Sequence, residues 1–381
     1  MRVKLKDIFD LQMGKTPSRS NLEYWNTTDY KWISIADLTK TSKYIFETKE
    51  YLSKSAIKDS GIKVIPANTV VMSFKLSIGK TAITKEDMYS NEAIMAFKDK
   101  HVINILPEYI FYLFKYKNWE EGSNKAVMGK TLNKATLSEI EVEICSIEKQ
   151  RQIVSILDKI MSSVDGRKQE LQLLDELIKA RFVEVFGDIN INDKNWECEF
   201  LGNLCTIVRG GSPRPIEKFL GGDVPWIKIG DATEADNIYL SSTKEHIIKE
   251  GVKNSRLVKE GSLIFANCGV SLGFARIITF DGCIHDGWLA MEDIDKRLDK
   301  VFLLQALNQM TEHFRAIAPA GTQPNLNTAI MKAYKQVIPP IELQKEFIRF
   351  VHQVNKSKVA VQKALDETQI LFDSLMQKYF G

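Results

Sequence analysis

The chain repeats itself once, and this repeat constrains the fold more than any other feature of the sequence. The hexapeptide at 32–37, Trp-Ile-Ser-Ile-Ala-Asp, recurs 194 residues later at 226–231 as Trp-Ile-Lys-Ile-Gly-Asp. The same offset relates Gly79 to Gly273, Leu132-Asn133 to Leu326-Asn327, Glu148 to Glu342, Gln150 to Gln344, and Phe186-Gly187 to Phe380-Gly381. Near the start the offset is 196, which pairs Thr16-Pro17 with Ser212-Pro213. A period this long indicates an internal tandem duplication of a whole domain, with copies at 1–187 and 188–381.

Each copy begins with a mixed region of strands and short helices. Apolar runs after turn-like segments predict strands at 70–74 and 262–266. Short helices are predicted at 107–117 and 298–310, and closing strands at 140–144 and 334–338. The fold class expected is therefore α+β, with two pseudo-symmetric mixed α/β domains.

Each copy then ends in a long helix with a coiled-coil pattern. In the first copy the positions spaced alternately by four and three are 153, 157, 160, 164, 167, 171, 174, 178, 181 and 185, and they are mostly apolar. Adding 194 reproduces the pattern from Phe347 to Tyr379. Ser146 is a suitable N-cap, Pro339-Pro340 precedes the second helix, and Gly187 and Gly381 stand where helices end.

Connectivity makes the two helices antiparallel if their apolar stripes pack together. The first helix leaves the first domain, and the second must return towards it, so a two-helix coiled coil separates the domains. The predicted division is 1–145 for the first domain, 146–187 for its helix, 188–339 for the second domain and 340–381 for its helix.

Composition excludes several classes of protein. The net charge is 52 − 49 = +3, and residues 1–145, with 22 basic and 18 acidic side chains, have a net charge of 22 − 18 = +4. No window of 18 consecutive apolar residues predicts a membrane span, and the first residues lack a signal peptide's apolar core. Five cysteines without a Cys-x-x-Cys pair indicate free thiols and no zinc site, so a cytoplasmic protein is expected.

Motifs for catalysis are missing. Gly-Lys-Thr occurs at 14–16, 79–81 and 129–131, but none has the glycine that a phosphate-binding loop needs five positions earlier. The five histidines are scattered, and no nucleophile or zinc-protease motif occurs. Asp37 with 47–49 loosely fits a nuclease pattern that the second copy does not reproduce. The expectation is a chain without catalytic residues and without a bound metal.

With these features the chain resembles the specificity (S) subunit of type I restriction-modification enzymes over nearly its full length. The most telling parts are the two Trp-Ile-x-Ile-x-Asp hexapeptides, Gly-Thr-Gln-Pro-Asn-Leu-Asn at 321–327, and Pro-Pro-Ile-Glu-Leu-Gln at 339–344. The first copy departs at 129–133, which is shorter by two residues, and at 145–150, which lacks the proline pair.

The resemblance implies a non-catalytic subunit that recognises double-stranded DNA. Each mixed domain would be a target recognition domain for one half of a bipartite site, and the helices would set the distance between the halves. Two methyltransferase (M) subunits would dock on the chain, and restriction (R) subunits would join through them. S-adenosylmethionine, ATP and Mg²⁺ would belong to those partners, so no cofactor is expected on this chain, and no membrane is involved.

Side chains that hydrogen-bond base edges or phosphates gather in loops at equivalent places in both copies. In the first copy the candidates are Lys15, Thr16, Ser18, Arg19, Lys75, Ser77, Lys80, Lys130 and Thr131. In the second copy they are Ser212, Arg214, Asn267, Ser271, Gln323 and Asn325. The amides in the last loop suit adenine. Asn133 and Asn327 are predicted helix N-caps, and Trp32 and Trp226 are predicted core residues.

A second group of candidates lies on the helices. Polar residues at the helix starts and on the apolar stripe are candidates for contacts within the coiled coil or with M subunits, namely Glu148, Gln150, Arg167, Arg181, Glu342 and Gln344.

Two other functions compete with DNA recognition. The chain would be a stand-alone nuclease or methyltransferase if it acted on DNA without partners. It would be a coiled-coil tether between protein-binding domains if it showed no salt-dependent affinity for DNA.

Overall fold

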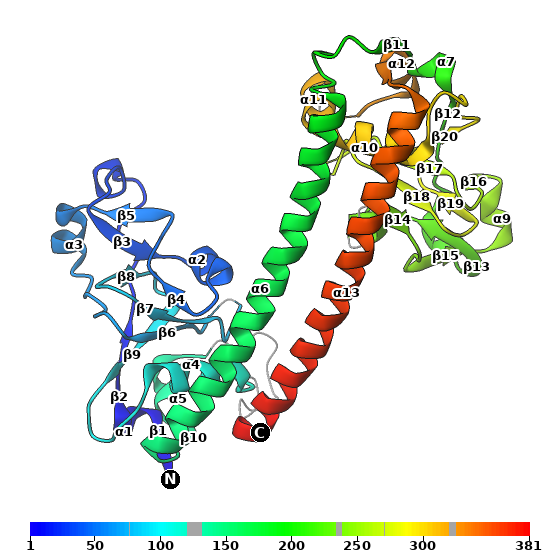
Figure 1. Ribbon diagram of the computed structural model, residues 1–381. Coiled ribbons are helices and arrows are strands. Elements are labelled where there is room, and N and C mark those ends of the chain that lie inside the picture. Colours follow the sequence, from blue (N-terminus) through cyan, green and yellow to red (C-terminus); the bar gives the residue numbers. More distant parts are fainter. Residues whose placement is uncertain (76, 120–131, 234–237, 270, 320–324) are drawn as a thin grey trace. The chain divides into compact units, whose positions relative to one another are not determined.

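The chain forms two compact units, each holding one globular domain (Figure 1). The computed structural model describes residues 1–75, 77–119, 132–233, 238–269, 271–319 and 325–381. The first unit comprises Met1–Lys168 with Lys363–Gly381, and the second comprises Gln169–Gln362. Each unit therefore contains a domain, the start of the long helix that follows it, and the end of the other long helix.

The domain of the first unit is built on a sheet with strand order β2-β9-β6-β7-β4, in which β4 and β7 run parallel and the other neighbours antiparallel. A second sheet has the order β5-β3-β8, and β1 pairs with β10. The strands are β1 (Arg2–Lys4), β2 (Phe9–Met13), β3 (Tyr30–Ile33), β4 (Tyr44–Ile45), β5 (Glu50–Leu52), β6 (Val70–Ser73), β7 (Thr81–Thr84), β8 (Tyr89–Ser90), β9 (Ile94–Asp99) and β10 (Glu141–Glu143).

The domain of the second unit repeats this topology, with β16 added at the edge of the smaller sheet. Its sheets have the orders β12-β20-β17-β18-β14 and β15-β13-β19-β16, and β11 pairs with β21. The strands are β11 (Glu197–Phe200), β12 (Thr206–Arg209), β13 (Leu220–Ile227), β14 (Tyr239–Leu240), β15 (Glu245–Ile247), β16 (Arg256–Val258), β17 (Leu263–Ala266), β18 (Ala275–Ile278), β19 (Gly282–Ile284), β20 (Trp288–Glu292) and β21 (Lys335–Ile338). The duplication seen in the sequence is thus a duplication of the fold.

Short helices cover these sheets. In the first unit they are α1 (Leu5–Ile8), η1 (Leu22–Tyr24), α2 (Ile35–Lys40), α3 (Lys54–Ser60), α4 (Pro107–Tyr116) and α5 (Lys134–Ser138). In the second they are α7 (Leu201–Leu204), η2 (Ile216–Lys218), α8 (Ile229–Thr233), α9 (Lys249–Val252), α10 (Lys300–Gln309), α11 (Thr311–Ile317) and α12 (Thr328–Ala333). The short elements predicted near 70, 107, 140, 262, 298 and 334 are all present.

The central strands are apolar without alternation because both faces of their sheet are covered. All four residues of β6 and all four of β17 are buried. On one face of the first sheet, Phe97 of β9 packs against Phe114 of α4, with ring centroids 4.7 Å apart. The predicted core residues Trp32 and Trp226 are buried. The predicted N-caps are also confirmed, since the side chain of Asn133 accepts from Thr136 N–H and that of Asn327 from Ile330 N–H, both at 2.9 Å.

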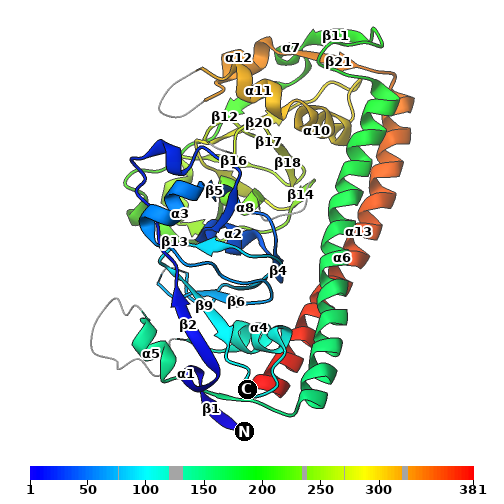
Figure 2. The ribbon, with the colours of Figure 1, turned by 90° about the vertical axis from the view of Figure 1, so that its left-hand side faces the viewer.

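The helices α6 (Ile147–Phe186) and α13 (Ile341–Phe380) are each 40 residues long. All the coiled-coil positions predicted from the spacing are buried or half-buried. In the first unit the start of α6 lies with the end of α13, and in the second unit the end of α6 lies with the start of α13, so the helices run antiparallel (Figures 1 and 2). Within the described residues no helix is both long and apolar enough to cross a membrane.

The C-terminal end of each long helix is buried in a globular core, which the coiled-coil spacing did not predict. Phe182 and Phe186 of α6 lie off the predicted stripe and pack on Phe302 and Phe347 in the core of the second unit. In the first unit Phe380 of α13 packs on Tyr109 and Phe372 on Tyr112 of α4. The chain's C-terminal residues therefore belong to the core of the N-terminal domain, as connectivity predicted.

The N-terminal end of each long helix is held by a buried glutamine, Gln150 in α6 and Gln344 in α13. The prediction that these two residues contact the other helix or a partner was wrong. Both side chains have no exposed surface. The amide of Gln150 accepts from Leu106 N–H at 2.9 Å and donates to the carbonyls of Asn104 and Cys145. The amide of Gln344 makes the same set of bonds, with Asp299 N–H and the carbonyls of Arg297 and Pro339. Each glutamine satisfies buried backbone groups of its own domain and offers nothing to a partner.

Replacing Gln344 with leucine should lower the free energy of unfolding, because three backbone groups lose their hydrogen bonds. The cost expected is about 1–3 kcal/mol for each buried group left unpaired. The matched control is Glu342→Ala, which removes an ion pair of 3.0 Å with Lys345 from an exposed position and should change stability by about 0.5 kcal/mol or less. Urea unfolding of both variants checks this, and equal midpoints would contradict the role given to Gln344.

Candidate nucleic-acid interface

The first candidate loop of each copy leaves its strand through a glycine that has no room for a side chain. A Cβ on Gly14 would lie 2.2 Å from the carbonyl oxygens of Ser90 and Asn91, and one on Gly210 would lie 2.1 Å from that of His285. These close approaches let the Gly14 N–H bond to Ile94 and the Gly210 N–H to Trp288, at 3.1 and 2.9 Å. The loops after β2 and β12 are therefore fixed against the turn that precedes β9 and β20.

A hydroxyl and a carboxylate then join the loop to that turn in both copies. Thr16 donates its hydroxyl hydrogen to the carboxylate of Glu92. Ser212 donates to Asp286 at 2.7 Å, and the backbone N–H of Asp286 points back to the Ser212 oxygen at 3.4 Å. Glu92 and Asp286 stand 194 residues apart, which is the offset of the repeat. Sequence analysis missed these two acids, although the offset alone pairs them.

Basic residues act on each carboxylate. The charges of Lys75 and Arg19 help to lower the pKa of Glu92. In the second unit the Arg214 guanidinium lies 3.7 Å from the Asp286 carboxylate. We call residues 15–19, 75, 77–80 and 90–92 the first loop cluster, and residues 211–214, 267–269, 271, 285–286 and 325 the second.

Both carboxylates remain charged at neutral pH. The hydrogen bond from Thr16 is the main cause that lowers the pKa of Glu92, and the neighbouring cations add to it. Burial alone would raise the pKa of Asp286, but the hydrogen bond from the Ser212 hydroxyl and the charge of Arg214 reverse this, and the pKa is lowered. Each loop cluster thus holds a fixed negative charge among its cations.

Most of the first copy's candidates have partners within the domain. The guanidinium of Arg19 forms a bidentate pair with Glu50 and lies over the ring of Trp25, 3.7 Å from its centroid. The ammonium of Lys15 donates to the Ser60 carbonyl. Ser18 and Ser77 are exposed. Lys80 reaches Thr39 of α2 at 2.5 Å, outside the first loop cluster.

In the second copy the structure overturns the prediction for Asn267. This side chain is completely buried, and it donates to Asn325 Oδ1 at 3.0 Å and to the Leu326 carbonyl at 3.1 Å. Its role is to hold the 325–326 segment against β17, and it cannot reach DNA in this arrangement. Asn325 and Ser271 are half-buried. Lys130, Thr131 and Gln323 lie outside the described residues.

The aspartate of the repeated hexapeptide has a structural role in both copies. Asp37 accepts from the Ser34 N–H and hydroxyl at 2.8 and 2.7 Å, and from Lys49 N–H at 3.1 Å. Asp231 accepts in the same way from the backbone N–H groups of Lys228 and Lys244. These bonds occupy the carboxylates with the start of α2 or α8 and the segment before β5 or β15, which explains why the motif recurs.

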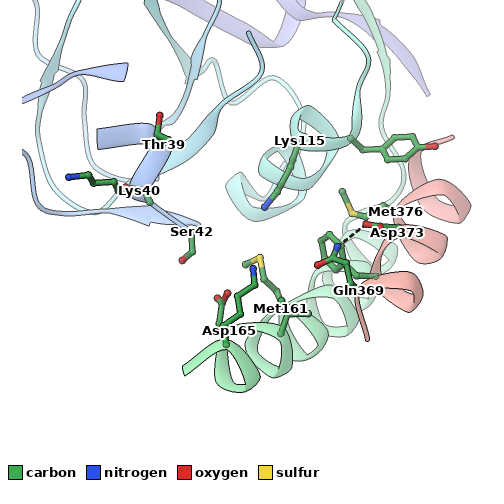
Figure 3. A pocket seen from close by; sticks show the side chains of 14 residues that line it. Thr39, Lys40, Ser42, Lys115, Met161, Asp165, Gln369, Asp373 and Met376 are labelled. Atoms are coloured by element: carbon green, nitrogen blue, oxygen red, sulfur yellow. Dashed lines mark hydrogen bonds between the residues drawn. The ribbon is translucent and has the colours of Figure 1, made fainter. Parts of the chain in front are cut away.

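A cleft in the first unit lies between the domain and the helix pair (Figure 3). It has a volume of about 560 Å³ and carries mixed charges, with Lys115 of α4 facing Asp165 of α6 and Asp373 of α13. Burial lowers the pKa of Lys115. The corresponding cleft of the second unit has Gln309 in place of Lys115 and Lys179 in place of Asp373. Because the charged residues of this cleft are not retained in the second unit, the cleft is not a binding site common to both domains.

His285 and Asn91 occupy equivalent positions beside the carboxylates, and each accepts a hydrogen bond from the backbone N–H two residues later. Asn91 Oδ1 accepts from Ala93 N–H at 3.0 Å, and His285 Nδ1 accepts from Gly287 N–H at 2.6 Å. A Cβ on Gly287 would lie 2.2 Å from the imidazole, so the larger ring goes with glycine two residues later. Burial lowers the pKa of His285, which keeps the accepting nitrogen unprotonated.

Comparison with known proteins gives matches to a single family in both halves of the chain. The family model described as "Type I restriction modification DNA specificity domain" matches twice, over residues 1–176 and 193–368. The MjaIX specificity subunit of Methanocaldococcus jannaschii is 25% identical over 400 residues, which cover 98% of this chain and 91% of that protein. The EcoR124I/EcoR124II specificity subunit of Escherichia coli is 26% identical over 171 residues, covering 42% of this chain and 41% of its own.

Solved structures share the fold at low identity. A structure reported with the assembly and conformational transition of the type I R-M system matches with a TM-score of 0.62 at 16% identity, covering 100% of this chain and 97% of its own. The crystal structure of the S subunit of a type I restriction-modification system from M. genitalium matches with a TM-score of 0.56 at 14% identity, covering 100% and 96%.

The His285 arrangement predicts a pH dependence of stability. The folded state disfavours protonation of this imidazole, whereas the unfolded state takes up a proton near pH 6.5. The contribution is therefore complete above pH 6.5 and is lost as the pH falls below it, with a slope of at most about 1.4 kcal/mol per pH unit. His285→Asn, which copies the first domain, should keep the hydrogen bond and flatten the profile between pH 7 and 5. If the free energy of unfolding falls equally with pH in both proteins between pH 7 and 5, His285 is not the cause of the pH dependence.

Proposed function

Because the chain belongs to the family of type I restriction modification DNA specificity domains and holds two copies of that domain, we propose that each loop cluster contacts one half of a bipartite DNA site. The observation that carries the proposal is that both clusters share one geometry around different side chains. The glycine, the hydroxyl and the carboxylate recur at equivalent positions, whereas the exposed polar residues around them differ. Such an arrangement suits two domains that bind DNA in the same way and recognise different bases.

The candidates divide by chemistry into residues for phosphates and residues for bases. Lys15, Lys75 and Arg214 carry cations at or near the surface of the loop clusters and suit phosphate oxygens. Asn325 lies in the second loop cluster and suits the edge of a base. Asn267 is withdrawn from this set because it is buried.

The chain is proposed to be non-catalytic and to act through partners. Two M subunits would dock on the long helices, with R subunits joined through them, and these partners would hold S-adenosylmethionine, ATP and Mg²⁺. Large apolar side chains exposed on α6 and α13 support docking there: Ile156, Leu173, Leu177, Val183, Val359, Ile370 and Leu371. Glu148 and Glu342 are exposed at the helix starts and remain candidates. Acting on DNA, the chain is expected in the cytoplasm.

Arg167 and Arg181 face the other long helix. The guanidinium of Arg167 donates to Thr368, and that of Arg181 lies 5.9 Å from the ring centroid of Phe350. Their part in the proposed complex is to stabilise the helix pair on which M subunits dock. The matches to known proteins support neither of the alternatives, the tether or the stand-alone enzyme.

Exchange of one domain should change one half of the methylated site. The pair β11–β21 closes the second domain, with Leu201 N–H bonded to the Tyr334 carbonyl at 2.8 Å. Replacing 201–334 with the equivalent segment of another family member therefore keeps the closing strands and the helix pair. Methylated-base sequencing of cells that also produce the M subunits should show one new half-site and one unchanged. Alteration of both halves would argue against separate recognition.

Lengthening both helices should widen the gap between the half-sites. Contacts between Arg167 and Thr368 and between Asp175 and Lys358 make position 170 face position 364. Inserting seven residues after each of these positions preserves the coiled-coil phase and adds about 10 Å. At about 3.4 Å per base pair, the gap in the methylated motif should grow by about three base pairs. An insertion in one helix alone is the control and should destabilise the pair. A motif with its original gap would exclude the proposed spacing role.

A further inference from the structure

The retained carboxylate of each loop cluster has a role that DNA affinity does not account for. Every duplex presents phosphates, and a negative charge beside a phosphate contact weakens that contact. Yet Glu92 and Asp286 occur at the same register of both copies, with the same hydroxyl donor type in front of them. A feature that opposes binding and still recurs has a role other than attraction.

The surroundings of the carboxylates indicate that role. Asp286 accepts from Ser212 through one oxygen, and its other oxygen lies 3.7 Å from Arg214. Glu92 accepts from Thr16, and the charges of Lys75 and Arg19 help to lower its pKa. Each acid thus fixes the first loop and places a negative charge near basic side chains that suit phosphate oxygens. Neither carboxylate is sequestered, since Glu92 is exposed and the Asp286 side chain is half-exposed.

We propose that Glu92 and Asp286 are specificity-determining positioning residues that reduce sequence-independent DNA binding. Specificity is the difference between the affinities for cognate and other sequences. Binding to random DNA depends on phosphate contacts, whereas cognate binding adds hydrogen bonds to base edges. In a cognate complex the base-edge hydrogen bonds fix where each loop cluster lies, whereas in a random complex the cations are free to settle on any phosphate. A fixed negative charge among the cations therefore weakens random binding more than cognate binding. This inference rests on the proposed function, since it assumes that the loop clusters contact DNA.

Direct recognition of a base by these acids is the other outcome. A carboxylate accepts a hydrogen bond from the cytosine N4 amino group. Two domains that recognise different half-sites would then keep the same acid only if both sites had cytosine there. The shared hydroxyl contact and the neighbouring cations favour the electrostatic role.

The test uses the full chain with its M subunits and isosteric variants. Glu92→Gln and Asp286→Asn remove the charge and keep an oxygen that accepts from Thr16 or Ser212. The probes are a duplex that carries the motif found by methylated-base sequencing, single-mismatch versions of it, and a random duplex of the same length. Affinities are measured by fluorescence anisotropy at several salt concentrations.

For each variant, affinity for the random duplex should rise by roughly two- to fivefold, the size of effect expected from one exposed charge. The salt dependence should steepen by about one unit, as for one added phosphate contact. Cognate affinity should change less, so the ratio of cognate to random affinity should fall. Ser212→Ala removes the hydroxyl and leaves the charge, and its salt dependence should match that of the unmodified chain.

Asp281→Asn is the matched control for net charge. Asp281 pairs with Lys259 at 2.7 Å before the start of β19, whereas Asp286 follows the end of that strand. An equal gain in random binding from Asp281→Asn would reduce the effect to net charge and overturn the proposal. So would unchanged random affinity in Asp286→Asn, or a loss of preference at one base pair only, which would assign the acid to a base. An unmodified complex that does not distinguish the motif from random DNA would instead refute the proposed function itself.

Discussion

Burial of aromatic rings at the far end of each long helix is the interaction on which the rest of the architecture depends. Phe182 and Phe186 enter the core of the second unit, and Phe372 and Phe380 that of the first. Each buried ring is worth about 1.5–3 kcal/mol, so detaching a helix end would cost several rings at once. The near end of each helix is held by a buried glutamine. Both units therefore contain a helix start from one copy and a helix end from the other, and neither copy alone completes a unit.

The sequence predicted the helices better than it predicted how they are anchored. A spacing that alternates between four and three residues over ten positions is characteristic of a coiled coil, and every position proved buried or half-buried. The same spacing does not include Phe182 and Phe186, because those rings pack on Phe302 of the globular core as well as on Phe347 of the other helix. The prediction that Gln150 and Gln344 lie at an interface failed for a similar reason. A polar residue near a helix start resembles a surface residue until the backbone groups that surround it are known.

The loops show where prediction from a single sequence ends. Residue type selected Asn267 as a base-contacting amide, but its backbone lies beneath the 325–326 segment and its side chain is buried. Conversely, Glu92 and Asp286 were passed over because an acid is an unexpected element of a DNA-binding surface. The internal offset was the available signal, since it pairs these acids with each other and pairs the functionally equivalent Asn91 and His285 beside them. Comparing the copies position by position carries more information than residue type does.

Comparing the two copies distinguishes the residues that fix the loops in both domains from the exposed residues that differ between them. Gly14 and Gly210 allow the loop to pass against the neighbouring turn, and the hydroxyl–carboxylate pair fixes it there. These contacts involve backbone or short side chains that cannot vary without moving the loop. The exposed side chains do not fix the loop in this way, although Lys15 and Arg19 contact neighbouring residues, and changing them should affect the fold little, as surface substitutions usually do. A rigid attachment beneath variable side chains lets the pattern of hydrogen-bonding groups change while its position is kept. Position matters as much as chemistry here, because a donor or acceptor displaced by an ångström no longer meets the edge of a base at hydrogen-bonding distance.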